Sequence, residues 1–135
     1  PVDNTIFADS KLTMINVWGT FCGPCLEEMP DLGEIHTEYA QDGMQVVGIV
    51  IDVTNKKGEP DQEQVEAAKE LIAQTKADYK HIVPSPELLK GVLKEASAVP
   101  MTYFVDSEGN ILESYLGARD KAAWKEIIDS LLAKM

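Results

Sequence analysis

The only two cysteines of this chain, Cys22 and Cys25, are separated by Gly23 and Pro24. A thiolate is the nucleophile in exchange between thiols and disulfides, and a neighbouring thiol can displace the product. The pair is therefore able to alternate between a dithiol and a disulfide. This pattern of residues predicts thiol–disulfide exchange chemistry.

The elements that flank the two cysteines favour a reactive thiol. The apolar run 12–17 predicts a buried strand, and apolar residues recur at helical spacing from Pro24 to about Ala40. Cys22 would then cap a helix N-terminus, where unpaired N–H groups and the helix dipole stabilise an anion. In such motifs the pKa of the attacking thiol falls from about 8.5 to roughly 3.5–7.5. We expect Cys22 to attack, and Cys25, about one turn further along, to displace the product and close the disulfide.

Two other uses of the cysteines are weaker. A structural zinc site has about four ligands, and the two histidines of the chain, His36 and His81, do not show ligand spacing. A purely structural disulfide between Cys22 and Cys25 would close a very short ring and so remove little entropy from the unfolded chain. We therefore expect redox chemistry and no metal site.

The rest of the chain alternates between strand-like and helix-like patterns. Pro30 falls inside the first helical pattern and is expected to kink that helix. Alternating strands and helices imply parallel strands, whereas the turn signal at 106–110 predicts an antiparallel hairpin at the end. The expected fold class is α/β, with a mixed, roughly five-stranded sheet and helices on both faces. The other expected strands are 45–51, 79–83, 101–105 and 111–116, and the other expected helices are 62–75, capped by Asp61, 86–96 and 120–133.

Length and composition predict one globular domain that covers residues 1–135, of which 44% are hydrophobic and 26% charged. Lys and Arg together number 12, and Asp and Glu together number 23, so the net charge is −11. This charge argues against nucleic acid and anionic membrane surfaces as partners. No apolar run has the length of a transmembrane helix. Because the chain begins at Pro1 without an initiating Met, we expect that an upstream segment has been removed.

Three short stretches carry a resemblance to a known family: residues 18–25, Glu28-Met29-Pro30 and 99–102, which read Val-Pro-Met-Thr. They resemble the thioredoxin superfamily and, more narrowly, the TlpA/ResA-like extracytoplasmic thiol–disulfide oxidoreductases of bacteria. The resemblance covers nearly the whole chain from Leu12 onward. It implies a thioredoxin-like fold with a strand–helix insert at about residues 55–96.

The resemblance also implies a role for individual residues. Cys22 would be the nucleophile and Cys25 the resolving cysteine, with no cofactor other than this redox-active disulfide. Pro100 matches the family's cis-proline, which faces the cysteine pair and helps to hold the substrate chain. Glu28 matches a buried acidic residue that transfers a proton to Cys25, and the alternative is a solvated helix glutamate. An apolar rim around the sulfur is the candidate docking surface, formed by Trp18, Phe21, Pro24 and Val99.

Two positions depart from the family pattern. Phe21 stands where the family most often has a second Trp directly before the first cysteine, so the aromatic character is retained. Asn16 stands where thioredoxin itself has a buried Asp in the strand. This second departure suits the subgroup, in which Glu28 takes over the acidic role.

The function that the resemblance implies is reduction of disulfides in exported proteins, such as apocytochrome c or a methionine sulfoxide reductase. A membrane thiol donor would supply the electrons, and the protein would be an extracytoplasmic monomer, anchored through a segment before Pro1. Two alternatives are a disulfide oxidase or isomerase, and a non-catalytic binding or sensor module on the same fold. The reduction potential of the cysteine pair distinguishes a reductase from an oxidase or isomerase. Replacement of Cys22 distinguishes an enzyme from a non-catalytic module.

Overall fold

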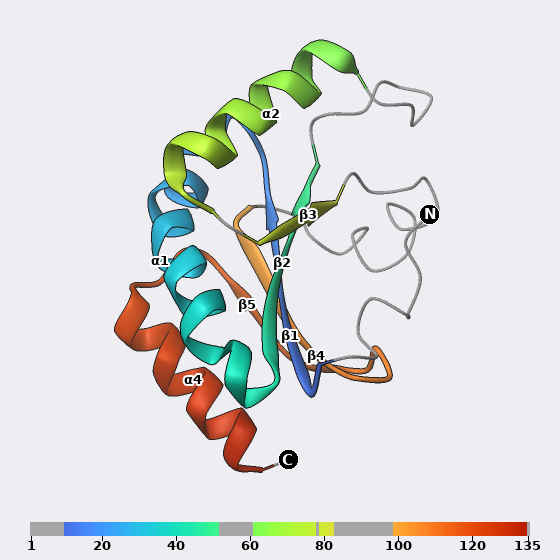
Figure 1. Cartoon of the computed structure of the whole chain (residues 1–135), viewed down its shortest axis with the longest axis vertical. Helices are drawn as coiled ribbons and strands as arrows, with labels where there is room; N and C mark the ends of the chain where they lie inside the picture. Colours follow the sequence, from blue (N-terminus) through green and yellow to red (C-terminus); the bar gives the residue numbers. More distant parts are fainter. Residues whose placement is uncertain (1–9, 52–60, 78, 83–98, 135) are drawn as a thin grey trace.

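The computed structural model describes residues 10–51, 61–77, 79–82 and 99–134. Figure 1 shows a twisted sheet with the helices of the described residues on one side. No helix within these ranges is long and apolar enough to cross a membrane. In chain order the elements are β1 (Leu12–Trp18), α1 (Gly23–Tyr39), the 3₁₀ turn η2 (Ala40–Asp42), β2 (Met44–Val50), α2 (Gln62–Thr75), β3 (Lys80–Ile82), β4 (Met101–Asp106), β5 (Ile111–Leu116) and α4 (Lys121–Ala133).

The five strands form one mixed sheet in the order β3-β2-β1-β4-β5. The central strand β1 pairs in parallel with β2 and antiparallel with β4. β3 continues the parallel part, while β5 returns antiparallel to β4 as the second strand of a hairpin. The mixed five-stranded α/β sheet and its terminal hairpin are therefore confirmed. Helices on both faces stay a prediction, because the described helices all pack into one cluster and the helix expected over residues 86–96 lies outside the described residues. β1 is the central strand of the sheet. The cysteine pair that follows its C-terminal end therefore lies between the parallel and the antiparallel half of the sheet.

The two faces of β1 belong to two separate apolar clusters. Successive side chains of a strand point to opposite faces, so Leu12, Met14 and Trp18 join one cluster and Ile15 and Val17 the other. The first cluster also takes in the buried faces of α1, α2 and α4, which lie together on one side of the sheet in Figure 1. The helix expected over residues 86–96 lies outside the described residues.

The N-termini of α2 and α4 are each capped by the side chain of an aspartate. Asp61 caps α2, since its side chain accepts a hydrogen bond from the backbone N–H of Glu63 at 3.1 Å. Asp120 caps α4 in the same way, through the N–H of Ala123 at 2.8 Å. Both expected helices therefore begin where predicted. Pro30 lies inside α1, which continues as one helix from Gly23 to Tyr39.

Candidate active site

Cys22 and Cys25 form a disulfide at the start of α1, with their Cα atoms 5.3 Å apart. A tight turn brings the chain there from β1, and it is closed by a hydrogen bond from the N–H of Cys22 to the carbonyl of Gly19 at 3.1 Å. Cys22 is the N-cap residue, and its sulfur accepts a hydrogen bond from the N–H of Cys25 at 3.2 Å. Pro24 occupies the first turn, where its missing N–H has no helical partner to lose.

This position gives the two sulfurs different environments. The sulfur of Cys22 meets the free N–H groups and the positive end of the α1 dipole, both of which stabilise a thiolate. Cys22 retains 5% of its surface, whereas Cys25 has none. Cys22 is therefore the outer sulfur of the pair and Cys25 the inner one.

Glu28 follows the disulfide by one helical turn and is buried, with only 3% of its surface exposed. Its Oε1 accepts a hydrogen bond from Asn16 Nδ2 at 3.0 Å. Its Oε2 accepts two more, from Trp124 Nε1 at 3.1 Å and from the backbone N–H of Arg119 at 3.3 Å. Burial raises the pKa of Glu28 above its ordinary value, and these hydrogen bonds oppose the rise. Glu28 is thus not a solvated helix glutamate, and a carboxyl group of this kind can exchange protons nearer to neutral pH.

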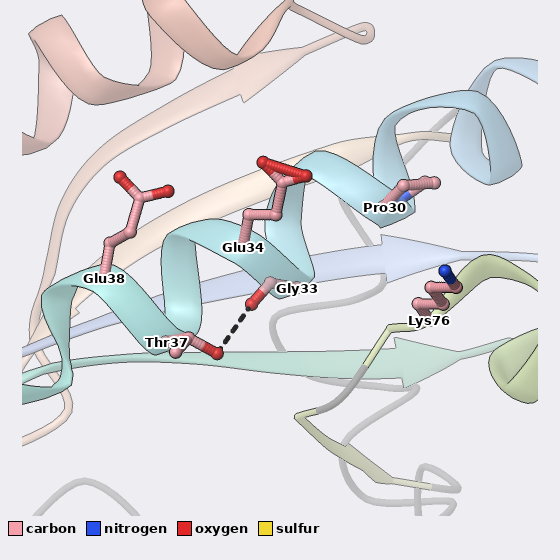
Figure 2. A pocket seen from close by; sticks show the side chains of 6 residues that line it. All are labelled: Pro30, Gly33, Glu34, Thr37, Glu38 and Lys76. Atoms are coloured by element: carbon pink, nitrogen blue, oxygen red, sulfur yellow. Dashed lines mark hydrogen bonds between the residues drawn. The ribbon is translucent and has the colours of Figure 1, made fainter.

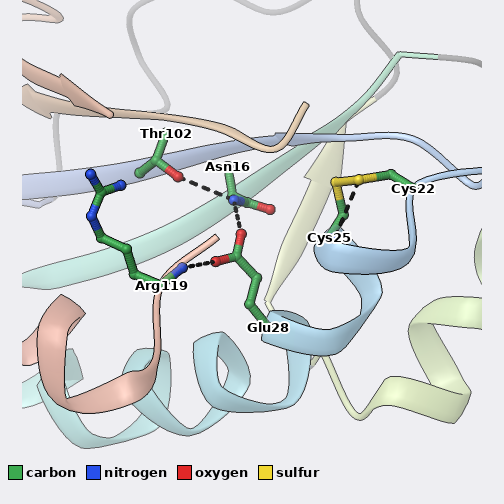
Figure 3. The surroundings of a disulfide bond; sticks show 6 residues. All are labelled: Asn16, Cys22, Cys25, Glu28, Thr102 and Arg119. Carbon is green, nitrogen blue, oxygen red and sulfur yellow. Dashed lines mark hydrogen bonds between the residues drawn. A yellow bond between two sulfur atoms is a disulfide. The ribbon is translucent and has the colours of Figure 1, made fainter. Parts of the chain in front are cut away.

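Asn16 connects the helix of the cysteines to the strand that follows Pro100. Its Nδ2 donates to Glu28 on α1 and also to Thr102 Oγ1 on β4, at 3.2 Å. Asn16 and Thr102 are completely buried. Figure 3 shows this group of side chains to the left of the disulfide, with Arg119 on the side of Glu28 that faces away from the cysteines.

The Val99–Pro100 peptide bond is cis. Pro100 is buried and Val99 half-buried, directly before β4. The carbonyl of Pro100 accepts a hydrogen bond from the N–H of Gly117 at 2.8 Å, so this segment is held by the strand end of β5.

The expected apolar rim is only partly at the surface. Phe21 has 69% of its surface exposed, and Pro24 is exposed as well. Trp18 departs from the expectation, since none of its surface is exposed. Its position in β1 turns the indole towards the core cluster, so Trp18 offers no contact surface to a partner.

Trp18 is instead hydrogen-bonded to His81 on β3. The indole Nε1–H donates to His81 Nδ1 at 3.2 Å, and His81 Nε2 lies 3.1 Å from the carbonyl of Ala77. This pairing fits a neutral imidazole with its hydrogen on Nε2, and burial lowers the pKa of His81. Gly48 leaves the room for the pair, because a Cβ there would overlap the His81 ring and approach the Trp18 indole.

Two surface cavities lie along α1. One, of about 290 Å³, reaches Glu28 and is lined by Pro24, Glu27, Glu28, Asp31, Ala118, Arg119 and Asp120. The other, of about 360 Å³, lies further along the helix and is lined by Pro30, Gly33, Glu34, Thr37, Glu38 and Lys76. Figure 2 shows the second cavity, which contains no residue of the cysteine site. The first cavity therefore lies beside the buried residue Glu28.

The partners of Glu28 were not predicted from the sequence. The Arg119 guanidinium stacks over the rings of Tyr115 and Trp124, at 4.6 and 5.4 Å from their centroids. In the sequence, Trp124 belongs to the apolar stripe of the last helix, and no local pattern connects it to a residue on α1. Among the described residues, no group of three or more His, Cys, Asp or Glu side chains is arranged to hold a metal ion.

Comparison with known proteins gives relatives of the same kind. Over 133 residues the chain is 29% identical to the thiol:disulfide interchange protein HelX of Rhodobacter capsulatus, covering 98% of this chain and 68% of that protein. It is 30% identical over 113 residues to the thiol-disulfide oxidoreductase ResA of Oceanobacillus iheyensis, covering 82% of this chain and 52% of that protein. The chain therefore spans about half to two thirds of these relatives.

The fold is shared with solved structures. A thioredoxin family thiol:disulfide interchange protein from Chlorobium tepidum superposes with a TM-score of 0.77 at 23% identity, over 95% of this chain and 84% of that one. Likeness at this level of identity supports the thioredoxin-like fold. The Redoxin family model matches residues 1–132, nearly the whole sequence. The chain therefore belongs to the Redoxin family.

Proposed function

We propose that this protein is a thiol–disulfide oxidoreductase that uses Cys22 and Cys25 as its redox-active pair. The observation that carries the proposal is the disulfide at the N-terminus of α1, with the Cys22 sulfur in the N-cap position. A sulfur in that position forms a stabilised thiolate on reduction. The relatives named for thiol–disulfide interchange support the same activity.

The reaction would proceed through a mixed disulfide. The Cys22 thiolate attacks one sulfur of the substrate disulfide, and the other substrate sulfur leaves as a thiolate and takes up a proton. The Cys25 thiolate then attacks the Cys22 sulfur, closes the disulfide and releases the second substrate thiolate. Two electrons thus pass from the protein to the substrate. Before the second attack Cys25 must lose a proton, and Glu28 is the proposed acceptor because it is buried one turn away with a raised pKa.

A substrate protein would dock around the outer sulfur. Phe21 and Pro24 expose apolar surface on one side of Cys22, and Val99 is half-buried before β4. Exposed aromatic side chains are frequent anchors in protein interfaces. We assign the cis-proline, Pro100, to the same surface, where it would hold the substrate chain.

We further propose that the physiological reaction is reduction of disulfides in exported proteins, with electrons from a membrane thiol donor. Apocytochrome c and a methionine sulfoxide reductase are candidate substrates. The similarity to HelX and ResA, which are named for thiol–disulfide chemistry, supports the disulfide exchange in this assignment. The proposal also includes an extracytoplasmic location, a membrane anchor before Pro1 and a monomeric state. The net charge of −11 does not favour nucleic acid as a partner.

Trapping with single-cysteine variants tests the activity. Cys25→Ser retains the attacking thiol and cannot resolve the mixed disulfide, so it should accumulate a covalent adduct with a disulfide-bonded substrate protein. Cys22→Ser should form no adduct and show no turnover. If partner binding and the cellular phenotype both survived in Cys22→Ser, the protein would instead be a non-catalytic binding module.

A further inference from the structure

The buried side chain of Asn16 has an unpaired oxygen. Both hydrogens of its amide are used, one towards Glu28 Oε1 at 3.0 Å and one towards Thr102 Oγ1 at 3.2 Å. Its Oδ1 has no hydrogen-bond partner among the residues that the structure describes. None of the Asn16 surface is exposed, and a buried acceptor without a donor costs about 1–3 kcal/mol. In Figure 3 this oxygen points away from Glu28, on the side of the disulfide.

The charge of Glu28 determines this orientation of the amide. Glu28 Oε2 already accepts hydrogen bonds from Trp124 Nε1 and the Arg119 N–H, which are both donors only. An ionised Oε1 can likewise only accept, so the NH₂ group of Asn16 must face it. The oxygen of the amide is then left to face Cys25. In the disulfide, Cys25 carries no hydrogen that this oxygen can accept.

We propose that Asn16 is a positioning residue whose side-chain amide turns over with the charge of Glu28 and so links the proton of Glu28 to that of Cys25. The inference rests on the proposed thiol–disulfide chemistry and deepens it. In the reduced protein with ionised Glu28, the Cys25 thiol supplies the missing donor to Asn16 Oδ1. A charged Glu28 and a protonated Cys25 are thereby stabilised together.

In the opposite state, with a protonated Glu28 and a Cys25 thiolate, every polar group of the Asn16 side chain again has a hydrogen-bond partner. When a proton leaves the Cys25 sulfur and reaches Glu28 Oε1, a thiol and a carboxylate become a thiolate and a carboxylic acid, without any transfer of electrons. The protonated Oε1 then needs an acceptor. A half-turn of the amide supplies Oδ1 to Glu28 and to the Thr102 hydroxyl, and it turns the NH₂ group towards the Cys25 thiolate. Asn16 thus favours the two states in which either Cys25 or Glu28, but not both, carries the proton.

Other ionisable groups around Glu28 set the background for this exchange. The Arg119 guanidinium acts on Glu28 through its charge, and Tyr79 and Glu28 act on each other in the same way. Glu27, Asp31 and Asp120 line the cavity that reaches Glu28. Of the described side chains that donate a hydrogen bond to Glu28, only that of Asn16 also carries an acceptor that can take the donor's place.

The oxidised wild-type protein provides the most direct test, because Cys25 does not titrate there and Glu28 does. We would follow nuclear Overhauser contacts of the Asn16 NH₂ hydrogens by NMR while lowering the pH through the titration of Glu28. The expected result is loss of the contact to Thr102 Hβ and gain of a contact to Cys25 Hβ as Glu28 takes up its proton. Unchanged contacts across this titration would overturn the proposal, although the redox function would stand.

Variants test the consequence in the reduced protein. The pKa of Cys25, measured from its ¹³Cβ shift, should fall in Glu28→Gln. This effect, expressed as a ratio of acid constants, should be about thirtyfold smaller when Asn16 is replaced by Leu. The reason is that a hydrogen bond of about 1 kcal/mol is removed from each of the two favoured states, about 2 kcal/mol together. Thr102→Val is the matched control, because it removes the other partner of the amide and should leave the Glu28→Gln effect within about twofold. An equal effect in the Asn16→Leu background would mean that Glu28 acts on Cys25 directly.

Discussion

Replacement of Trp124 by Phe tests the hydrogen bond that α4 donates to the buried carboxylate of Glu28. Trp124 is completely buried and donates its Nε1–H to Glu28 Oε2 at 3.1 Å. Phenylalanine keeps an aromatic ring in the same cluster but has no donor. Glu28 is left with the N–H of Arg119 and the amide of Asn16.

The expected cost depends on the charge of Glu28. A hydrogen bond to a charged group contributes about 1.5–3 kcal/mol, whereas a bond between neutral groups contributes about 0.5–1.5 kcal/mol. The smaller ring adds a packing loss of about 1 kcal/mol at any pH. Trp124→Phe should therefore lower the free energy of unfolding by about 2.5–4 kcal/mol at pH 8, and by about 1–1.5 kcal/mol less than that at pH 4. It should also raise the pKa of Glu28 further, since the bond from Trp124 opposes the effect of burial.

Urea denaturation of the oxidised proteins at both pH values measures this difference. Ile128→Val is the matched control, because Ile128 is equally buried on the same helix and is not a hydrogen-bond donor to Glu28. It should cost about 0.5–1.5 kcal/mol, with the same value at pH 4 and pH 8. An equal loss for Trp124→Phe at both pH values, or an unchanged pKa of Glu28, would refute the reasoning.

Three further substitutions test other parts of the account. Because burial raises the pKa of Glu28, its contribution to stability should be fully present below the ordinary glutamate pKa and be lost as pH rises through the raised value. Glu28→Gln should remove this part of the pH dependence in denaturation series between pH 4 and 9. Phe21→Ala should lower kcat/KM about tenfold for a protein disulfide, leave a small disulfide reagent unaffected and change stability by less than about 0.5 kcal/mol. Gly48→Ala should cost about 1–3 kcal/mol in urea denaturation, since its Cβ overlaps the His81 ring, whereas Gly23→Ala, with open space at its Cβ, should not.

Much of the fold could be predicted because its signals are local. The last helix carries an uninterrupted apolar stripe, of which Trp124, Ile128 and Leu131 are buried. The turn at 106–110 joins two strands that do pair antiparallel, as expected. β3 begins at Lys80, one residue later than expected, and its expected end at residue 83 lies outside the described residues. The start of a short edge strand depends on its neighbour and has little signal of its own.

Apart from the cis-proline Pro100, which the family resemblance implied, the site could be predicted only where its residues are neighbours in sequence. The cysteine pair and the helix that it caps form one local motif, so the disulfide could be expected from the spacing of Cys22 and Cys25. The surroundings of Glu28 come from α4 and the loop before it, far along the chain, and no periodic pattern connects Glu28 with Trp124. The burial of Trp18 was missed for a related reason. The apolar run in β1 marks both faces as buried, so it does not distinguish a core residue from a rim residue at the strand end.

The central claim is that Cys22 and Cys25 are a reversible redox pair that acts as a reductant. A titration in dithiothreitol or glutathione buffers, read by the mass shift on thiol alkylation, tests it directly. We predict a single two-electron transition below about −220 mV, closer to thioredoxin than to protein disulfide isomerase. A transition between about −120 and −180 mV would instead indicate an oxidase or isomerase. The absence of any reversible transition would contradict the redox function itself.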